Sequence, residues 1–133
     1  MPLAKLDHFL IRAKDLGATL TFYQDVLGLR DGDRPPFPFP GNWLYLGDAP
    51  VVHLVAEGFD ANQSDYLADD GPREAFGTGV VDHIAFLADD LEAMLGHLES
   101  INVSARRREV AGLIQLFIED PNGITIELNF PTD

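Results

Sequence analysis

The sequence predicts an α+β protein made of two similar halves, each with a strand and a helix followed by two or three antiparallel strands. Segment 7–16 recurs as segment 82–91, with an Asp-His pair and a closing Asp-Leu pair in register and no gap between the copies. His53 lies 45 positions after His8, and Glu127 lies 44 positions after His83, so each half ends in an apolar segment with one potential metal ligand. Neither half could bury its sheet alone, so the halves must pack together or against another chain.

The first half predicts a strand, a helix and a hairpin. Segment 6–11 is apolar and is typical of a buried strand. Asp15 is a good N-cap and Gly28 marks the C-terminal end of the helix that follows. Prolines between positions 35 and 40 exclude a regular helix, after which segments 43–46 and 51–55 predict a hairpin. The helical stripe consists of Leu16, Leu20, Tyr23, Val26 and Leu27.

The second half predicts the same order of elements. Segment 81–87 is a strand, Asp89 or Asp90 caps a helix, and segments 115–118 and 124–128 form a hairpin across an Asp-Pro-Asn-Gly turn. The helix carries Leu91, Met94, Leu95, Leu98 and Ile101. We therefore expect one domain over residues 1–133, with module one at 1–56, an acidic linker at 57–79 without sustained periodicity, and module two at 80–133.

Composition narrows the classes of function. The chain has 133 residues and no cysteine, so a metal would be held by imidazole and carboxylate groups. Nine Lys and Arg against 22 Asp and Glu give a net charge of −13, which disfavours nucleic acid and anionic membranes as partners. We find no signal peptide and no segment of membrane-spanning length, and expect a soluble cytoplasmic protein that binds a small molecule. An anionic substrate would need a local cationic pocket.

Two further groups have both a structural and a functional interpretation. Arg106-Arg107-Arg108 is the only basic cluster, and we interpret it as a solvated loop before a strand or as an anion clamp. Trp43 and Tyr45 lie two positions apart in a predicted strand, where they would pack in the core or stack on a planar substrate.

The four candidate ligands fall on matching strand faces. Side chains alternate across a strand, so a sheet curved around the faces of His8, His53, His83 and Glu127 would gather all four. Each would carry a desolvation cost if partly buried alone, and one shared cation would remove it. Three imidazoles and a carboxylate suit zinc, nickel, iron(II), manganese or cobalt, and leave positions open for water or substrate.

Nearly the whole chain resembles the vicinal oxygen chelate superfamily, which includes glyoxalase I, extradiol ring-cleavage dioxygenases, and fosfomycin- and bleomycin-resistance proteins. The motifs that carry the resemblance are Phe-Tyr-Gln-Asp-Val-Leu-Gly-Leu at 22–29, Glu-Asp-Pro-Asn-Gly at 119–123 and Ile-Glu-Leu at 126–128, beside the histidine segments. The resemblance implies two β-α-β-β-β modules that form a cupped mixed sheet around one divalent metal. It implies metal ligation by His8, His53, His83 and Glu127, and a homodimer whose sites are often shared between subunits.

The chain departs from the glyoxalase pattern at two positions. Glyoxalases have glutamate or glutamine where this chain has His53, so Glu127 or a metal-bound hydroxide would serve as the base. Arg12 matches the arginine that binds the glutathione carboxylate in bacterial glyoxalases, but the asparagine that partners it there is Glu57 here. A carboxylate should repel glutathione, so the resemblance implies a glyoxalase-like enzyme other than an ordinary lactoylglutathione lyase.

Three functions remain open from the sequence. The leading hypothesis is a metal-dependent lyase or isomerase whose metal chelates adjacent oxygens of a small substrate, with Glu127 and His53 as catalytic residues. The rival enzyme is an extradiol-type dioxygenase, because His8, His83 and Glu127 match the two-histidine, one-carboxylate triad of nonheme iron, with His53 as an acid or base. A protein of another class, which sequesters an antibiotic in the same cleft, would bind its ligand equally well without metal.

Overall fold

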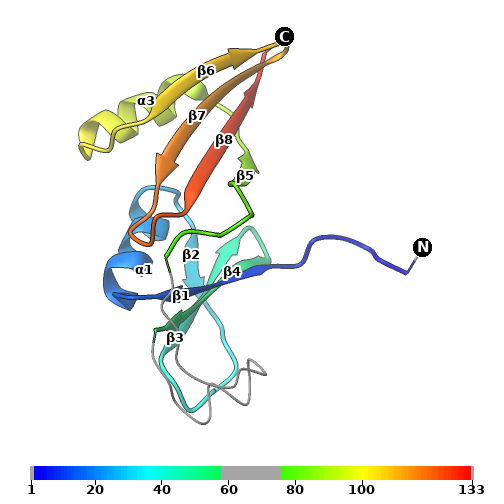
Figure 1. The fold of residues 1–133 in the computed structure, drawn as a ribbon, viewed down its shortest axis with the longest axis vertical. Helices are drawn as coiled ribbons and strands as arrows, with labels where there is room; N and C mark the ends of the chain where they lie inside the picture. Colours follow the sequence, from blue (N-terminus) through cyan, green and yellow to red (C-terminus); the bar gives the residue numbers. More distant parts are fainter. Residues whose placement is uncertain (1, 58–75, 133) are drawn as a thin grey trace. The chain divides into compact units, whose positions relative to one another are not determined.

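The computed structural model describes residues 2–57 and 76–132 and divides the chain into two compact units, Met1–Ala75 and Phe76–Asp133. Within these described ranges, each unit has one helix and one four-stranded mixed sheet (Figure 1). Most of the predicted linker 57–79 lies outside the described residues. No helix in the described ranges is long and apolar enough to cross a membrane.

Unit one follows the order strand, helix and three strands. Its elements are β1 (Phe9–Ala13), α1 (Leu16–Asp25), β2 (Arg30–Gly32), β3 (Gly41–Leu46) and β4 (Ala49–Ala56). The sheet order is β1-β4-β3-β2, with β1 parallel to β4 and the other pairs antiparallel. The Asp15 carboxylate caps α1 by accepting from the Ala18 amide at 2.9 Å, and Gly28 follows with a φ of 73° that favours glycine. The predicted helix boundaries and hairpin are confirmed.

Unit two repeats this order. Its elements are β5 (Ile84–Leu87), α3 (Leu91–Ser100), β6 (Arg106–Val110), β7 (Leu113–Glu119) and β8 (Thr125–Pro131), and the sheet order is β5-β8-β7-β6. Asp90 is the helix cap, with its carboxylate accepting from Ala93 at 3.1 Å. The Asp120 carboxylate closes the predicted turn by accepting from the amides of Asn122 and Ile124, each at 2.8 Å. Both units are β-α-β-β-β, which confirms the predicted fold class.

The structure corrects three details of the sequence analysis. Arg106, Arg107 and Arg108 lie inside strand β6, where they pair with β7, and do not form a loop. Their exposure follows from the position of β6 at the edge of its sheet. The first strand of each unit also starts later than predicted, at Phe9 and Ile84, because the paired registers with β4 and β8 begin there.

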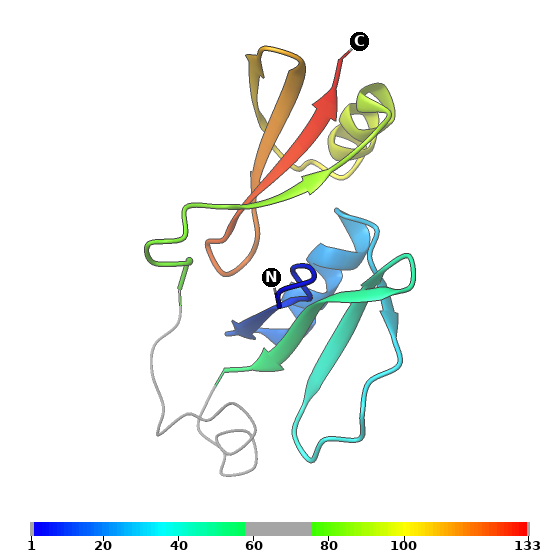
Figure 2. The ribbon, with the colours of Figure 1, turned by 90° about the vertical axis from the view of Figure 1, so that its right-hand side faces the viewer.

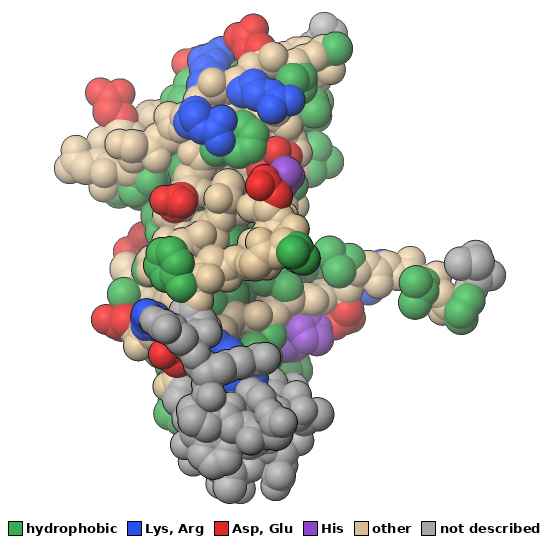
Figure 3. Space-filling model, in the orientation of Figure 1, with side chains coloured by type: hydrophobic (Ala, Val, Ile, Leu, Met, Phe, Trp, Pro, Cys, Tyr) green, Lys and Arg blue, Asp and Glu red, His purple; other side chains and the backbone are tan. Residues whose placement is uncertain are grey.

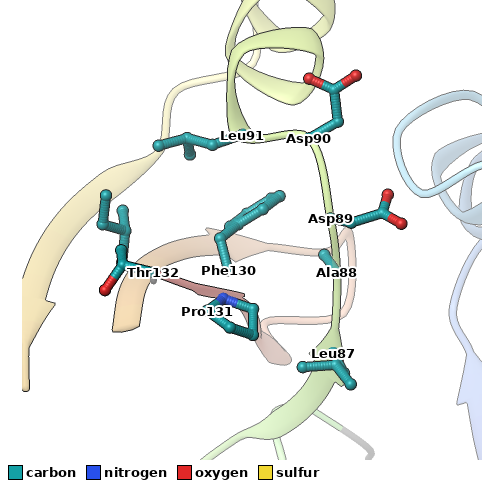
Figure 4. A pocket seen from close by; sticks show the side chains of 9 residues that line it. Leu87, Ala88, Asp89, Asp90, Leu91, Phe130, Pro131 and Thr132 are labelled. Carbon is teal, nitrogen blue, oxygen red and sulfur yellow. The ribbon is translucent and has the colours of Figure 1, made fainter. Parts of the chain in front are cut away.

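Each sheet has one face buried in the core of its own unit and a second face that carries the candidate site. In unit two, the core face carries Leu116, Ile118, Ile126 and Leu128, and Leu98 of α3 is also buried. Figure 2 shows α3 beside the sheet of its own unit. A pocket of about 580 Å³ lies where β5 and β8 end near the start of α3 (Figure 4). It contains none of the predicted site residues. Its lining residues are Leu87, Ala88, Asp89, Asp90, Leu91, Ile114, Phe130, Pro131 and Thr132.

Candidate metal and substrate site

Unit one brings His8 and His53 together as parallel rings. His53 lies on β4 opposite Leu10 of β1, and His8 precedes β1 by one residue, so alternation places both imidazoles on one face. Their ring centroids are 3.7 Å apart with an interplanar angle of 11°. The Trp43 ring stacks on the other side of His53 at 4.0 Å, again at 11°. We call His8, His53 and Trp43 the aromatic stack.

Hydrogen bonds orient the two imidazoles of the stack differently. His8 Nδ1 lies 2.7 Å from Asp7 Oδ2, and because the carboxylate only accepts, Nδ1 donates, so that in the neutral ring the lone pair is on Nε2. His53 Nε2 donates to the Pro50 carbonyl at 3.0 Å, which leaves Nδ1 buried without a hydrogen-bond partner. Burial and then the nearby His8 lower the pKa of His53, so the neutral ring is favoured.

Unit two brings His83 and Glu127 together as a polar pair. His83 directly precedes β5, and its Nε2 lies 3.4 Å from Oε1 of Glu127 on β8. His83 Nδ1 donates to Asp82 Oδ2 at 2.8 Å, in the same arrangement as His8 with Asp7. This bond, and then the charge of Glu127, raises the pKa of His83, while desolvation opposes the shift. The glutamate itself is 7 % exposed.

An amide chain holds the second oxygen of Glu127. Asn129 Nδ2 donates to Glu127 Oε2 at 2.9 Å, and Gln115 Nε2 donates to Asn129 Oδ1 at 2.9 Å. A carboxylate can only accept here, so the direction of both bonds is fixed from Glu127 outward. At the far end, Gln115 Oε1 is buried without a hydrogen-bond partner. We call Gln115, Asn129 and Glu127 the amide chain.

Sequence reasoning did not assign roles to the residues that support the candidate ligands. Asp7 and Asp82 orient the histidines, and the Asp-His pair in the repeat was the available signal. Asn129 and Gln115 had no comparable signal in the sequence, because strand alternation places them on the face of Glu127 but does not indicate that they take part in a contact. His8 and His83 are also more exposed than predicted, with side-chain exposures of 36 % and 37 %, so desolvation is a weaker argument for them.

The predicted substrate-binding residues all lie in unit one. Arg12 is half-buried on β1, on the face of His8, and Trp43 belongs to the aromatic stack. Tyr45 donates to the Asp33 carbonyl at 2.6 Å, and the Arg30 guanidinium lies 4.8 Å from the centre of its ring. Glu57 follows β4, and its Oε2 is buried without a hydrogen-bond partner. A role of these residues in substrate binding stays a prediction.

The donor atoms fit a divalent metal, although within the described ranges no group of three or more His, Asp or Glu residues gathers closely enough to hold one. Two donors bound to one ion at about 2.1 Å lie roughly 3.0–3.4 Å apart for right-angled to tetrahedral geometry, and His83 Nε2 and Glu127 Oε1 meet that distance. His8 offers a lone pair on Nε2 with its other nitrogen bonded to a carboxylate, as is usual for metal-binding histidines.

The aromatic stack fits the metal less well as a pair of ligands. An ion bound to an imidazole nitrogen lies close to the plane of that ring. The planes of His8 and His53 are nearly parallel, so no single ion can lie in both planes unless one ring turns. Because His53 is buried and bonded to Pro50, this geometry favours His8 as the ligand and His53 as its packing partner.

Comparison with known proteins places the chain in a family. The model described as the Glyoxalase/Bleomycin resistance protein/Dioxygenase superfamily matches residues 5–128, and the chain belongs to this superfamily. The uncharacterized protein YwbC of Bacillus subtilis is 30 % identical, over 92 % of this chain and 94 % of its own length. Lactoylglutathione lyase of Schizosaccharomyces pombe is also 30 % identical, over 93 % of this chain, which spans 46 % of that enzyme.

Solved structures share the fold. A lactoylglutathione lyase from Agrobacterium tumefaciens superposes with a TM-score of 0.70 at 22 % identity, covering 98 % of this chain and 96 % of its own. TnmS3, an antibiotic-binding protein from a Streptomyces species, gives a TM-score of 0.68 at 18 % identity, with 99 % of each chain covered. At these identities the structures establish the fold and leave the activity open, since enzymes and binding proteins occur among them.

Proposed function

We propose that this protein is a divalent-metal-dependent, glyoxalase-like enzyme that acts on a small substrate with two adjacent oxygens. The observation that carries the proposal is the repeated carboxylate-histidine arrangement: Asp7 and Asp82 each hold Nδ1 of the next histidine, which leaves Nε2 to bind a metal. We propose His8, His83 and Glu127 as ligands of zinc, nickel, iron(II), manganese or cobalt. Such an ion, when bound, supplies a Lewis acid that stabilises negative charge on a substrate oxygen.

Glu127 and His53 have different proposed roles in moving protons. Glu127 is the proposed base, and Asn129 keeps its carboxylate oriented by donating to Oε2. His53 supports the ring of His8 by stacking, and its unpartnered Nδ1 is an acceptor at which a proton can be held. Its lowered pKa favours the neutral ring that such a role requires.

We propose that the substrate is not the glutathione adduct on which an ordinary lactoylglutathione lyase acts. Glu57 lies two residues beyond Val55, which pairs with Arg12, so the carboxylate and the guanidinium share a face of the sheet. A negative group at this place opposes a second carboxylate. Arg12, Trp43 and Tyr45 stay proposed substrate contacts, for a substrate without the glutathione carboxylate at this position.

A second candidate, an extradiol-type dioxygenase, is favoured by one specific observation. If His53 remains stacked and bonded to Pro50, the remaining ligands are two histidines and one carboxylate, which is the donor set of nonheme iron oxygenases. In this alternative His53 is an acid or base beside the ion.

Metal reconstitution followed by two assays tests the proposal. Protein stripped with chelator is loaded with each of the five metals, and turnover of 2-oxoaldehydes is measured with and without glutathione. Anaerobic loading with iron(II), followed by oxygen uptake with catechols, tests the dioxygenase. The proposal predicts stoichiometric metal and turnover that does not need glutathione. Protein that takes up no metal after reloading would overturn it, and equal affinity for an antibiotic with and without metal would favour a binding protein.

We also propose that the protein forms a homodimer. Apolar side chains before the first strand of each unit are almost fully exposed, including Leu3, Leu6 and Val80. Exposed apolar segments of this kind are typical of surfaces that pair with another chain. Sedimentation at several concentrations measures the assembly, and a monomer at micromolar concentration would contradict it.

A further inference from the structure

The site face of unit two continues past Glu127 to the arginines of edge strand β6. Arg106 pairs with Phe117, which pairs with Glu127, so these residues form one row across three strands. Arg108, Gln115 and Asn129 form the neighbouring row in the same way. Paired residues point to the same face, so both arginines lie on the side of the sheet that carries Glu127.

We infer that Arg106, Arg108 and Gln115 form a subsite for an anionic group of the substrate, so that the substrate has adjacent oxygens at one end and a carboxylate or phosphate at the other. The inference rests on the proposed function, because it names the substrate class of the same site. Neighbouring strands lie about 4.8 Å apart, so β6 is roughly 10 Å from β8 and the anionic group lies at about that distance from Glu127.

The three arginines of β6 differ in whether their charge is paired with an acidic side chain. Arg107 points to the opposite face, and its Nη2 lies 3.4 Å from Oε1 of Glu109. In the part of the chain that the structure describes, neither Arg106 nor Arg108 forms an ion pair, although the chain carries 22 acidic residues. The Arg106 guanidinium instead lies 4.3 Å from the centre of the Phe117 ring, which fixes its position over the site face. Figure 3 shows Lys and Arg side chains gathered over β6 and β7.

The orphaned oxygen of Gln115 is a second, independent sign of a ligand. Gln115 is 8 % exposed, and its Oε1 must remain an acceptor because its amide nitrogen is committed to the amide chain. A buried acceptor without a donor is unfavourable, and a hydroxyl or N–H of a bound ligand removes that cost. Because Gln115 is the cross-strand partner of Arg108, one ligand segment meets both. The substrate therefore carries a hydrogen-bond donor next to its anionic group.

Anion binding by the metal-free protein tests the subsite apart from the metal. Inorganic phosphate is titrated while NMR follows the Nε–Hε signals of the arginine side chains. We expect the signals of Arg106 and Arg108 to shift together. The double variant Arg106→Gln/Arg108→Gln should weaken binding by about tenfold or more, as for loss of charge-assisted hydrogen bonds. Arg107→Gln is the matched control and should bind phosphate as the wild type does. Equal binding by all three proteins, or no saturable binding, overturns the inference.

A second experiment measures the binding of hydroxamates, which present two adjacent oxygens, to zinc-loaded protein. The hydroxamates carry tails of increasing length. Tails end in a carboxylate, a phosphonate or a methyl ester. We expect the charged tails to bind about tenfold or more tightly than the ester at the best length, and this preference to vanish in the double variant but not in Arg107→Gln. The stronger of the two charged tails identifies the anion. The phosphate titration decides the subsite without any metal, whereas the proposed function is refuted if none of the five metals binds the protein.

Discussion

The two units share the same scaffold and the same Asp-His pair, but the side chain that contacts the histidine differs between them. In unit one, His8 meets a buried neutral imidazole that is packed between two rings. In unit two, His83 meets a carboxylate that accepts from Asn129, which in turn accepts from Gln115. The comparison shows that the β-α-β-β-β frame fixes the position of the residue that faces each histidine, His53 or Glu127. The cross-strand neighbours set the surroundings of that residue: Trp43 lies beside His53, and Phe117 lies with the amide chain around Glu127.

Removing the carboxylate of unit two should have the largest effect. We expect Glu127→Ala to lower metal affinity by about 100-fold or more, because loss of a ligand exceeds the usual effect of its supporting residues. Titration calorimetry measures the affinity, and circular dichroism checks the fold. Glu119→Ala, an exposed carboxylate on β7, is the control and should bind metal normally. Normal affinity in Glu127→Ala would remove this residue from the metal site.

The aspartates should have the next largest effect, and they test whether the two units contribute alike. We expect Asp7→Asn and Asp82→Asn each to lower metal affinity by about 10- to 100-fold, because each carboxylate orients its histidine. Asp89→Asn, an exposed acid between β5 and α3, serves as the control. A loss confined to one aspartate would mean that only one unit supplies a histidine ligand.

His53→Phe separates the two roles of the buried imidazole. Phenylalanine keeps a ring between His8 and Trp43, so we expect little change in metal affinity but a lower kcat if Nδ1 takes part in proton transfer. Calorimetry and steady-state kinetics measure the two effects separately. A large loss of metal affinity would instead make His53 a ligand, which requires its ring to turn out of the observed stack.

The smallest expected effect is a difference between the pKa values of the histidines in the two units. In metal-free protein we expect His53 to titrate below its ordinary value of 6.5 and His83 above it, as followed by NMR of the imidazole protons. A folded pKa below the unfolded one means that His53 loses its contribution to stability as the pH falls through 6.5 toward its folded pKa. His83 contributes stability below 6.5 and loses it as the pH rises through its raised pKa. Equal titration midpoints for His53 and His83 would contradict this difference between the two units.

The sequence predicted the elements whose signals are local. Asp15 and Gly28 bound α1 as expected, and the turn before Thr125 forms at the predicted Asp-Pro-Asn-Gly. Pairing was harder to predict, since the charged run 106–108 has no apolar alternation and becomes a strand only through β7. Strand alternation placed His8 with His53 and His83 with Glu127, but the ring planes and the direction of the amide chain depend on side-chain contacts that no sequence pattern encodes.

The aromatic stack has an optical consequence. Trp43 is the one tryptophan of the 133-residue chain, and its ring lies 4.0 Å from that of His53. A protonated imidazole in contact with an indole quenches its emission, whereas a neutral one does so far less. The intrinsic fluorescence of this protein is therefore a single-site reporter of the charge on His53, readable without a label in every variant that retains both rings.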